Sequence, residues 1–438
     1  MTEQTKAANI TEIDICCPAR GVSWLTVIVL SLLIVVQDLP IIQRRAGGYT
    51  IFLPFILLFF LCTFTRWLRP KKQDLPLIGC SLLYLAIDLL YRFVGISSAG
   101  YGRIIHPLMY LVVFASMSVV QQMNRSQKRF LLCVIVFATL TEILLNVREF
   151  HRLGSAYFSI QRNENDLSAT NVASTQYLTA LMLMSGALFI ASLRDRKPGR
   201  RLIWAALLII CILFNLLIMQ RALILLLSAA MFGLMFIFNA RRKLAVNLLI
   251  LLAVVLFAVV LLNYEAVFSL LGKVIKSARI TARLNQISRA LSQRSVMQGG
   301  GSLTARFKLY LISLNTWTSS PGTFLFGVGD HISGYSVIGN HSQFFDVLGR
   351  YGLLGGFCMF YFVLKTLSIL MRRLPISRGT PVYRQTLVIP WIFVIRGFMG
   401  GVVFGAIAVR LFIFLPIVFS LIFDDEESLE LSLAQLSG

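Results

Sequence analysis

The sequence predicts an all-α integral membrane protein with about 12 transmembrane helices and one large, partly helical, outward-facing loop between helices 9 and 10. Three observations predict this class. Hydrophobic residues make up 57% of the 438 residues and charged residues only 14%, which is more apolar surface than one soluble core can bury. Apolar runs of about 20 residues, the length that crosses the hydrocarbon layer, recur along nearly the whole chain. Lys and Arg gather in alternate loops.

The apolar runs follow one another from the N-terminal part of the chain to its end. They cover residues 22–38, 49–65, 75–93, 104–120, 130–146, 172–193, 202–219, 222–239, 244–263, 351–370, 385–396 and 402–422. The eleventh run is short and contains Pro390, so we expect a broken or tilted helix there, followed by a turn at 396–401.

The positive charge indicates how the helices are oriented. Loops with three to five Lys or Arg residues each lie at 66–74, 121–129, 194–201, 240–243 and 371–386. By the positive-inside rule these loops and both termini are cytoplasmic, and the long segment 264–350 faces outward. The net charge of +22 therefore reflects topology, and no nucleic-acid partner is expected. We predict a cytoplasmic tail at 1–21, one membrane domain at 22–422 that includes loop 264–350, and an acidic cytoplasmic tail at 423–438.

The outward segment has helical periodicity of its own. Apolar residues recur at helical spacing between basic ones over 267–294, which predicts an amphipathic helix at the membrane surface. Three glycines at 299–301 interrupt this pattern. A second helix is expected from Leu303 to about Thr318, and Ser320, Pro321 and Gly322 close it.

Neither cysteines nor acidic residues suggest a metal or redox site on the outer side. No cysteine lies in an outer loop of this topology, so we expect no disulfide framework, and no Cys-x-x-Cys motif is present. No pair of carboxylates in an outer loop offers oxygen ligands to a divalent ion. We therefore predict no metal and no other cofactor.

Residues with chemical potential gather in the second half of the outward segment. Arg306 comes first, then Pro321-Gly322 and Gly327-Val328-Gly329, then Asn340-His341-Ser342-Gln343 ahead of a glycine-rich helix start at 352–356. This order resembles the O-antigen ligase and O-antigen polymerase superfamily, in which an arginine precedes a proline- and glycine-containing turn and a histidine precedes a glycine-containing helix start. Arg221, in a tight turn between two spans, matches a further arginine of that family. The chain departs from the pattern at Gln220, where serine is usual, and at Ser342, where asparagine is commoner.

The resemblance implies a GT-C-like helical fold and metal-independent transfer of a glycan from undecaprenyl diphosphate to a sugar hydroxyl. A hydroxyl needs a base as it attacks, and an imidazole with a pKa near 6.5 suits that task, so His341 is the candidate base. The diphosphate gathers negative charge as it leaves, and Arg306 and Arg221 are the candidates that neutralise it. Weaker substrate-binding candidates are Arg289, Arg162, Asn165, Asn340 and Gln343.

Several alternatives remain open at this point. His331 beside Asp330 is a rival base, and charged residues inside the spans, Asp88, Glu142 and Arg410, are expected to pair or to pack helices together. The likeness fits a polymerase of lipid-linked repeat units in O-antigen or capsule synthesis, and equally an O-antigen ligase that uses lipid A core as the acceptor. We favour the polymerase because polymerases are the more numerous members.

A glycolipid flippase or transporter is a third reading, and it is disfavoured because the chain shows no repeated halves. The expected partners are an undecaprenyl-diphosphate-linked glycan donor, a glycan acceptor, membrane lipids and, for a polymerase, a chain-length regulator. The expected location is the bacterial inner membrane, with the active site on its periplasmic face.

Overall fold

The protein, described here by a computed structural model, is helical wherever its structure is described. The described residues are 21–38, 52–67, 74–94, 105–154, 157, 175–219, 222–239, 302–329, 337–339, 342–400 and 406–423, and within them there is no β-strand. The predicted all-α class is confirmed for this part of the chain.

Many of the helices coincide with predicted apolar runs, but α6 and α16 extend well beyond the predicted runs 130–146 and 351–370. They are α1 (Trp24–Asp38), α3 (Phe52–Trp67), α4 (Leu75–Phe93), α5 (Ile105–Gln122), α6 (Arg125–Leu153), α8 (Thr175–Arg194), α9 (Pro198–Leu213), the π-helix η4 (Phe214–Met219), α10 (Ala222–Asn239), α14 (Ser302–Trp317), α15 (Pro321–Phe326), α16 (Gln343–Arg373), α17 (Pro381–Met399), α18 (Ala406–Ala408) and the π-helix η5 (Val409–Phe414). Residues 415–423 continue the helix beyond η5.

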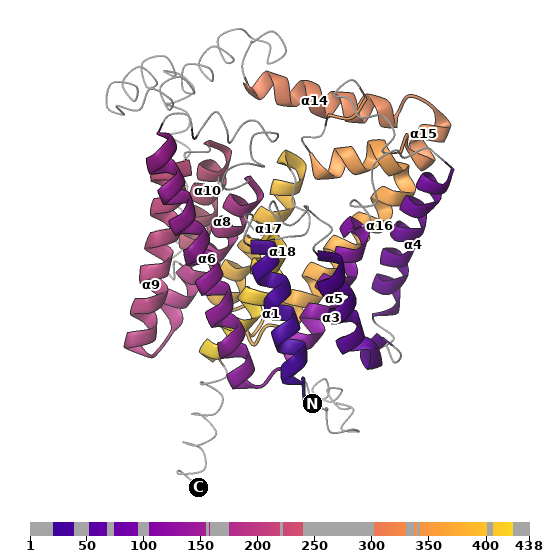
Figure 1. The fold of residues 1–438 in the computed structure, drawn as a ribbon. Coiled ribbons are helices and arrows are strands. Elements are labelled where there is room, and N and C mark those ends of the chain that lie inside the picture. The colour runs from indigo at the N-terminus through magenta and orange to yellow at the C-terminus, as the bar shows by residue number, and fades with distance from the viewer. Residues whose placement is uncertain are drawn as a thin grey trace, which may run out of the picture.

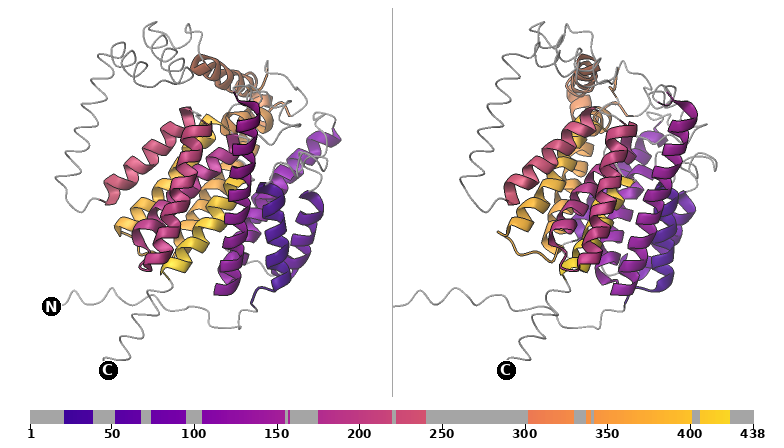
Figure 2. Two further views of the ribbon diagram at one scale, coloured as in Figure 1. Left: turned by 60° about the vertical axis from the view of Figure 1, so that its left-hand side comes forward. Right: turned by 90° about the vertical axis from the view of Figure 1, so that its left-hand side faces the viewer.

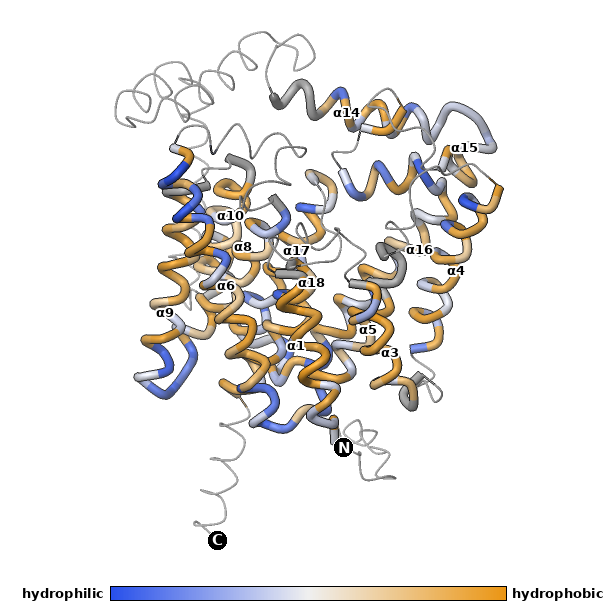
Figure 3. Tube along the Cα trace, viewed as in Figure 1, coloured by the Kyte–Doolittle hydropathy of each residue, from blue (hydrophilic) through white to orange (hydrophobic). Residues whose placement is uncertain are grey.

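Several of these helices have the length and composition of membrane spans. Within the described ranges, 5 helices are long and apolar enough to cross a membrane: Leu75–Phe93, Arg125–Leu153, Gln176–Arg194, Pro198–Leu216 and Gln343–Arg373. Shorter apolar helices are Trp24–Val36, Leu53–Phe64, Leu111–Gln122, Ile224–Phe238 and Val409–Phe423. Figure 3 shows hydrophobic residues along the middle of the helices and hydrophilic ones toward their ends. This pattern is compatible with a multi-pass membrane protein; the predicted span 244–263 lies outside the described residues, and the total of twelve stays a prediction.

α4 shows how such a helix is solvated. One of its faces is buried against the bundle through Leu77, Tyr84 and Tyr91, whereas Leu83 and Phe93 on the other side are exposed, Phe93 to 91%. A helix that exposes large apolar side chains this fully is unfavourable in water, but it is well solvated by lipid chains.

The long helices stand roughly side by side, and α14 lies across one end of the bundle (Figures 1 and 2). α15 and the first turns of α16 lie at the same end, which we call the α14 end. α8 begins at this end and leads at Arg194 into a short turn at the opposite end, from which α9 returns.

Polar side chains fix two helix starts. Asn124 and Gln127 form a reciprocal capping box at the start of α6, and the Gln127 side-chain amide donates to the backbone carbonyl of Val22 at 2.7 Å, which ties α6 to α1. Thr380 caps α17 by accepting the backbone N–H of Tyr383 at 3.2 Å.

This cap corrects the predicted bounds of the eleventh run. α17 begins at Pro381 and continues through Pro390 to Met399, so it is longer than the apolar run 385–396 and is not interrupted. Arg396 consequently belongs to the last turn of the helix rather than to a turn between helices.

Of the charged residues predicted inside the bundle, Asp88 and Arg410 connect helices, and Glu142 bonds within its own helix. Asp88 pairs with Arg92 at 2.8 Å and accepts the Tyr351 hydroxyl at 2.8 Å, which joins α4 to α16. Arg410, in η5, donates through Nη2 to the Thr139 hydroxyl of α6 at 2.6 Å. Glu142, one turn further along α6, accepts the side-chain amide of Asn146 at 2.9 Å.

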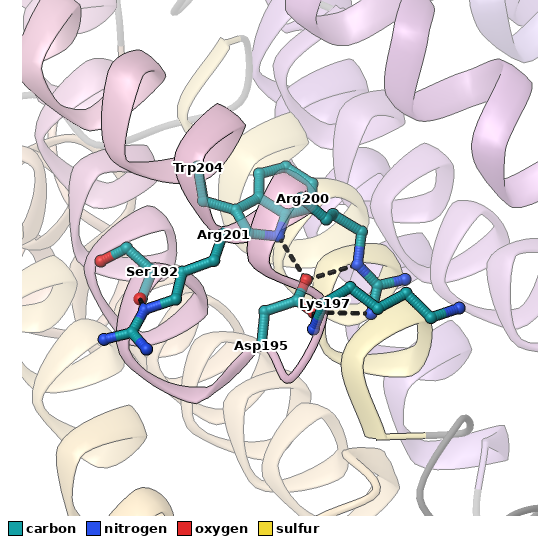
Figure 4. Close-up of polar contacts among 6 residues, drawn as sticks. All are labelled: Ser192, Asp195, Lys197, Arg200, Arg201 and Trp204. Carbon is teal, nitrogen blue, oxygen red and sulfur yellow. Dashed lines mark hydrogen bonds and ion pairs between the residues drawn. The ribbon is translucent and has the colours of Figure 1, made fainter.

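The turn between α8 and α9 is organised around one carboxylate (Figure 4). The fully buried Asp195 accepts hydrogen bonds from Nη2 of Arg200 at 2.9 Å, Nε1 of Trp204 at 2.8 Å and the backbone N–H of Lys197 at 3.0 Å, and it also pairs with Nε of Arg200. Burial alone raises the pKa of Asp195, but the hydrogen bonds from Arg200, Trp204 and Lys197 and the charge of Arg200 hold that pKa below its usual value.

The substitution Asp195→Asn should lower the free energy of unfolding by about 2 kcal/mol near neutral pH, because buried, charge-assisted hydrogen bonds are lost. Since the pKa is lower in the folded state, the carboxylate stabilises fully above the unfolded pKa of about 3.9, and this stabilisation is lost as pH falls through the folded pKa. Thermal unfolding in detergent should therefore show a difference between native protein and variant that shrinks toward acid pH.

Glu149→Gln is the matched control for Asp195. Glu149 pairs with Arg152 at 2.7 Å, but the Arg152 side chain is 60% exposed, so the pair should contribute less than about 0.5 kcal/mol. A difference between native protein and Asp195→Asn that does not change with pH would contradict the assigned role.

Candidate functional site

Most of the predicted site residues lie outside the described residues, whereas the helices next to them in the chain are described. His341, Arg221, Arg289, Arg162, Asn165 and Asn340 lie outside the described residues, as do His331 and Asp330. The backbone of Arg306 lies in α14, and Gln343 is the first residue of α16.

Hydrogen bonds to Asp346 hold the positions on both sides of Asn340 and His341. The Ser313 hydroxyl of α14 donates to Asp346 Oδ1 at 2.6 Å, and the backbone N–H of Ser342 donates to Asp346 Oδ2 at 3.1 Å. The backbone N–H of Gly339 donates to the same Ser313 hydroxyl at 2.9 Å. Ser313, Ser342 and Asp346 are buried, so these bonds are shielded from solvent. Residues 339 and 342 are therefore both fixed to the contact between α14 and α16.

Ser342 also caps a helix. Its hydroxyl oxygen accepts the backbone N–H of Phe345 at 3.3 Å, which makes Ser342 the N-cap of α16. The departure from the commoner asparagine thus retains a side chain that can cap a helix.

The last turn of α17 provides three backbone carbonyls to this region. Gly397 accepts the Ser342 hydroxyl at 3.4 Å, Gly400 accepts the backbone N–H of Gln343 at 3.3 Å, and Met399 accepts the Tyr310 hydroxyl of α14 at 3.2 Å. We call these residues, 397–400, the α17 platform. α14, α16 and α17 consequently meet around the residues that follow His341.

The predicted glycine-containing turn is present and docks on α16. The backbone N–H groups of Val328 and Gly329 donate to the carbonyls of Gly349 and Arg350 at 3.0 and 2.8 Å. Gly327 and Gly352 have φ values of 75° and 63°, which favour glycine. The structure adds the short helix α15 ahead of the turn, capped by Ser320.

The two backbones touch where these glycines lie. A Cβ at Gly327 would overlap the backbone of Arg350, and a Cβ at Gly352 would overlap the backbone of Leu325. The φ and ψ of Gly352 are not helical, so α16 bends there, and Figure 1 shows its first part running beneath α14. Glycine is thus required on both sides of the contact.

Aromatic residues of α4 support the same junction. The Tyr91 hydroxyl donates to the backbone carbonyl of Phe326 at the end of α15. The Tyr91 ring stacks on Tyr351 with centroids 6.0 Å apart, and Tyr84 meets Tyr351 edge-on at 5.2 Å. α4 therefore holds α15 and the bend of α16 together.

Arg396 is a charged residue at this end that sequence reasoning missed. It is only 3% exposed, and its Nε donates to the Thr179 hydroxyl of α8 at 3.1 Å. The cap signal Thr380-Pro381 could have moved the predicted start of this helix from 385 to 381, but it does not show that the helix continues past Arg396.

The described side chains contain no group of three or more His, Cys, Asp or Glu residues that could hold a metal ion. The predicted absence of a metal stays a prediction, because several outer residues lie outside the described ranges.

No protein-family model matches the chain, and no curated protein matches it. The resemblance to the O-antigen superfamily therefore rests on the residues between 306 and 356 and on Arg221.

The substitution Gly352→Ala should destabilise the protein by about 3 kcal/mol or more, because the added Cβ meets backbone and the residue keeps a φ of 63°. Gly379→Ala is the control: its φ of 88° is equally unfavourable, but nothing lies within 4 Å of an added Cβ, so a cost of about 1 kcal/mol is expected. Thermal unfolding of both variants in detergent measures the difference. Equal costs would mean that the close backbone contact contributes nothing.

Proposed function

We propose that the chain is a metal-independent glycosyltransferase that polymerises undecaprenyl-diphosphate-linked oligosaccharide repeat units on the outer face of the inner membrane. One observation carries the proposal: the positions on either side of Asn340 and His341 are held by buried hydrogen bonds where α14, α16 and α17 meet. A general base needs a fixed place relative to its substrate, and this framework supplies fixed attachment points.

The proposed topology has twelve spans, both termini in the cytoplasm and the α14 end outside. The charge of the α8–α9 turn supports this orientation. It carries Arg194, Arg196, Lys197, Arg200 and Arg201 and lies at the end opposite α14, as the positive-inside rule requires of a cytoplasmic turn.

The helical face that bears Arg306 supports its assignment. Tyr310 and Ser313 follow Arg306 by four and seven residues, so these positions share one face of α14. Tyr310 bonds the α17 platform and Ser313 bonds Asp346, so α14 is attached to this framework four and seven residues after Arg306.

Arg221 immediately precedes α10, which packs along α17. The Gln385 amide near the start of α17 donates to the carbonyl of Met235 near the end of α10 at 2.9 Å, so the two helices are antiparallel. The beginning of α10 is therefore level with the end of α17, and this supports a role for Arg221 at the same site.

The proposed reaction needs no redox partner. The imidazole of His341 takes the proton of the acceptor hydroxyl while its oxygen attacks the anomeric carbon of the donor sugar. The bond from that carbon to the diphosphate oxygen breaks, and undecaprenyl diphosphate leaves with the bonding electrons. The guanidinium groups of Arg306 and Arg221 stabilise the negative charge that it gains.

A strain that lacks the gene should make surface glycan limited to single repeat units, because nothing joins one unit to the next. Electrophoresis of the lipid-linked and lipid A-linked glycan measures the chain length. Long chains that accumulate on the lipid carrier would contradict a polymerase and indicate a ligase. Units retained at the cytoplasmic side would indicate a transporter.

The variant His341→Ala should insert normally but lose glycan transfer by at least about 100-fold, because the acceptor hydroxyl loses its base. His331→Ala is the matched control in the same segment and should retain transfer. Transfer by purified protein, measured with a lipid-linked donor, tests both variants. If His331→Ala lost glycan transfer and His341→Ala kept full activity, His331 would be the base instead of His341.

A further inference from the structure

Arg396 is placed to act on the predicted site through the backbone that it holds. Its guanidinium occupies the space beside Gly400, since a Cβ there would overlap Nη1, and its Nε bonds Thr179 of α8 at 3.1 Å. A cation in the last turn also complements the partial negative charge of the α17 C-terminus. The side chain therefore connects α8 to the end of α17.

Helix packing indicates that Arg396 lies at the same level along the bundle as the start of α10, which follows Arg221. A Cβ at Gly186 of α8 would come within 3.2 Å of Met231 of α10 and Ile389 of α17, so the three helices meet there. Thr179 and Arg396 each lie seven residues from that contact toward the α14 end, or about 10 Å at 1.5 Å per residue. Counting the same distance along α10 from Met231 reaches Ile224, in the turn that directly follows Arg221.

The segment that Arg396 supports carries the residues that follow His341. The α17 platform accepts the Ser342 hydroxyl, the Gln343 backbone N–H and the Tyr310 hydroxyl. These bonds depend on where the carbonyls of 397–400 point. The guanidinium, packed against Gly400, sets the path of the backbone at that turn.

We infer that Arg396 is a positioning residue that places the proposed base, His341, by fixing the α17 platform on which the start of α16 rests. The inference builds on the proposed function, and Arg396 itself contacts no substrate in it. Because the residue acts on the alignment of the base, its loss should lower kcat while KM stays nearly constant.

The first test measures structure without any substrate. Hydrogen exchange, followed by mass spectrometry of the protein in nanodiscs, reports on residues 342–346, in which the backbone N–H groups of 342, 343, 345 and 346 form hydrogen bonds. Arg396→Ala should speed exchange there. Thr179→Val, which replaces the acceptor hydroxyl by a methyl group, and Gly400→Ala, whose added Cβ displaces the guanidinium, should act in the same direction. They carry the test if Arg396→Ala does not fold.

Thr139→Val is the matched control. It removes the acceptor of a second buried arginine, Arg410, and this pair does not involve the α17 platform. It should leave exchange at 342–346 unchanged. Native-like exchange in folded Arg396→Ala, Thr179→Val and Gly400→Ala would overturn the inference, whatever the enzyme assay shows.

The second test measures transfer per folded molecule. We expect kcat to fall about 10- to 100-fold in Arg396→Ala, with partial recovery in Arg396→Lys, because an ammonium keeps the charge but cannot make the same contacts. Faster exchange with unchanged kcat would overturn the positioning role. No transfer by the native protein would instead remove the proposed function, and the exchange result would still decide whether Arg396 holds the platform.

Discussion

The close approach of two backbone segments, 325–329 and 349–352, is the constraint on which the α14 end depends. No side chain separates them, because Gly327 and Gly352 stand on opposite sides of the contact and neither leaves room for a Cβ. Backbone donors at 328 and 329 then reach carbonyls at 349 and 350. Since α15 precedes one segment and the bend of α16 lies in the other, this single contact sets how the outer helices meet the bundle.

Several hydroxyl groups in the apolar bundle bond the backbone of their own helix. Ser31, Ser81 and Thr366 donate to carbonyls four residues earlier in their own helices. Tyr351 and Asp88 bond across two helices instead. A hydroxyl in a medium without water must be satisfied by the protein, and a helix offers its own carbonyls for this. The side chains that bond across helices therefore define which helices are neighbours.

Sequence patterns predicted where the helices lie better than they predicted which polar side chains bond to one another. The bounds of α4 and α10 agree with runs 75–93 and 222–239. A long apolar stretch with polar residues on both sides indicates where its helix begins and ends. The α14 helix was also predicted from the sequence, and the glycine-containing turn was expected from the family resemblance. Ser313 and Asp346 gave no signal, because nothing local shows that a serine on one helix faces a carboxylate 33 residues later.

The start of α17 shows the same limit in another form. The predicted run began at 385, whereas α17 begins at Pro381. Gln385 is polar, yet it is fully buried and bonds the carbonyl of Met235 on α10. Its environment comes from a helix that lies 150 residues away in the chain. Arg396 was assigned to a turn in the same way, because its partner Thr179 comes from α8, 217 residues away in the chain.

The bend at Gly352 divides α16 into two parts that contact different neighbours. Residues 343–351 are attached to α14, α15 and α17, whereas the remainder runs on as a long apolar helix. Helices of that kind change their tilt with the thickness of the surrounding bilayer. The bend at residue 352 separates this long helix from the residues ahead of it, which are bonded to their neighbours at the α14 end.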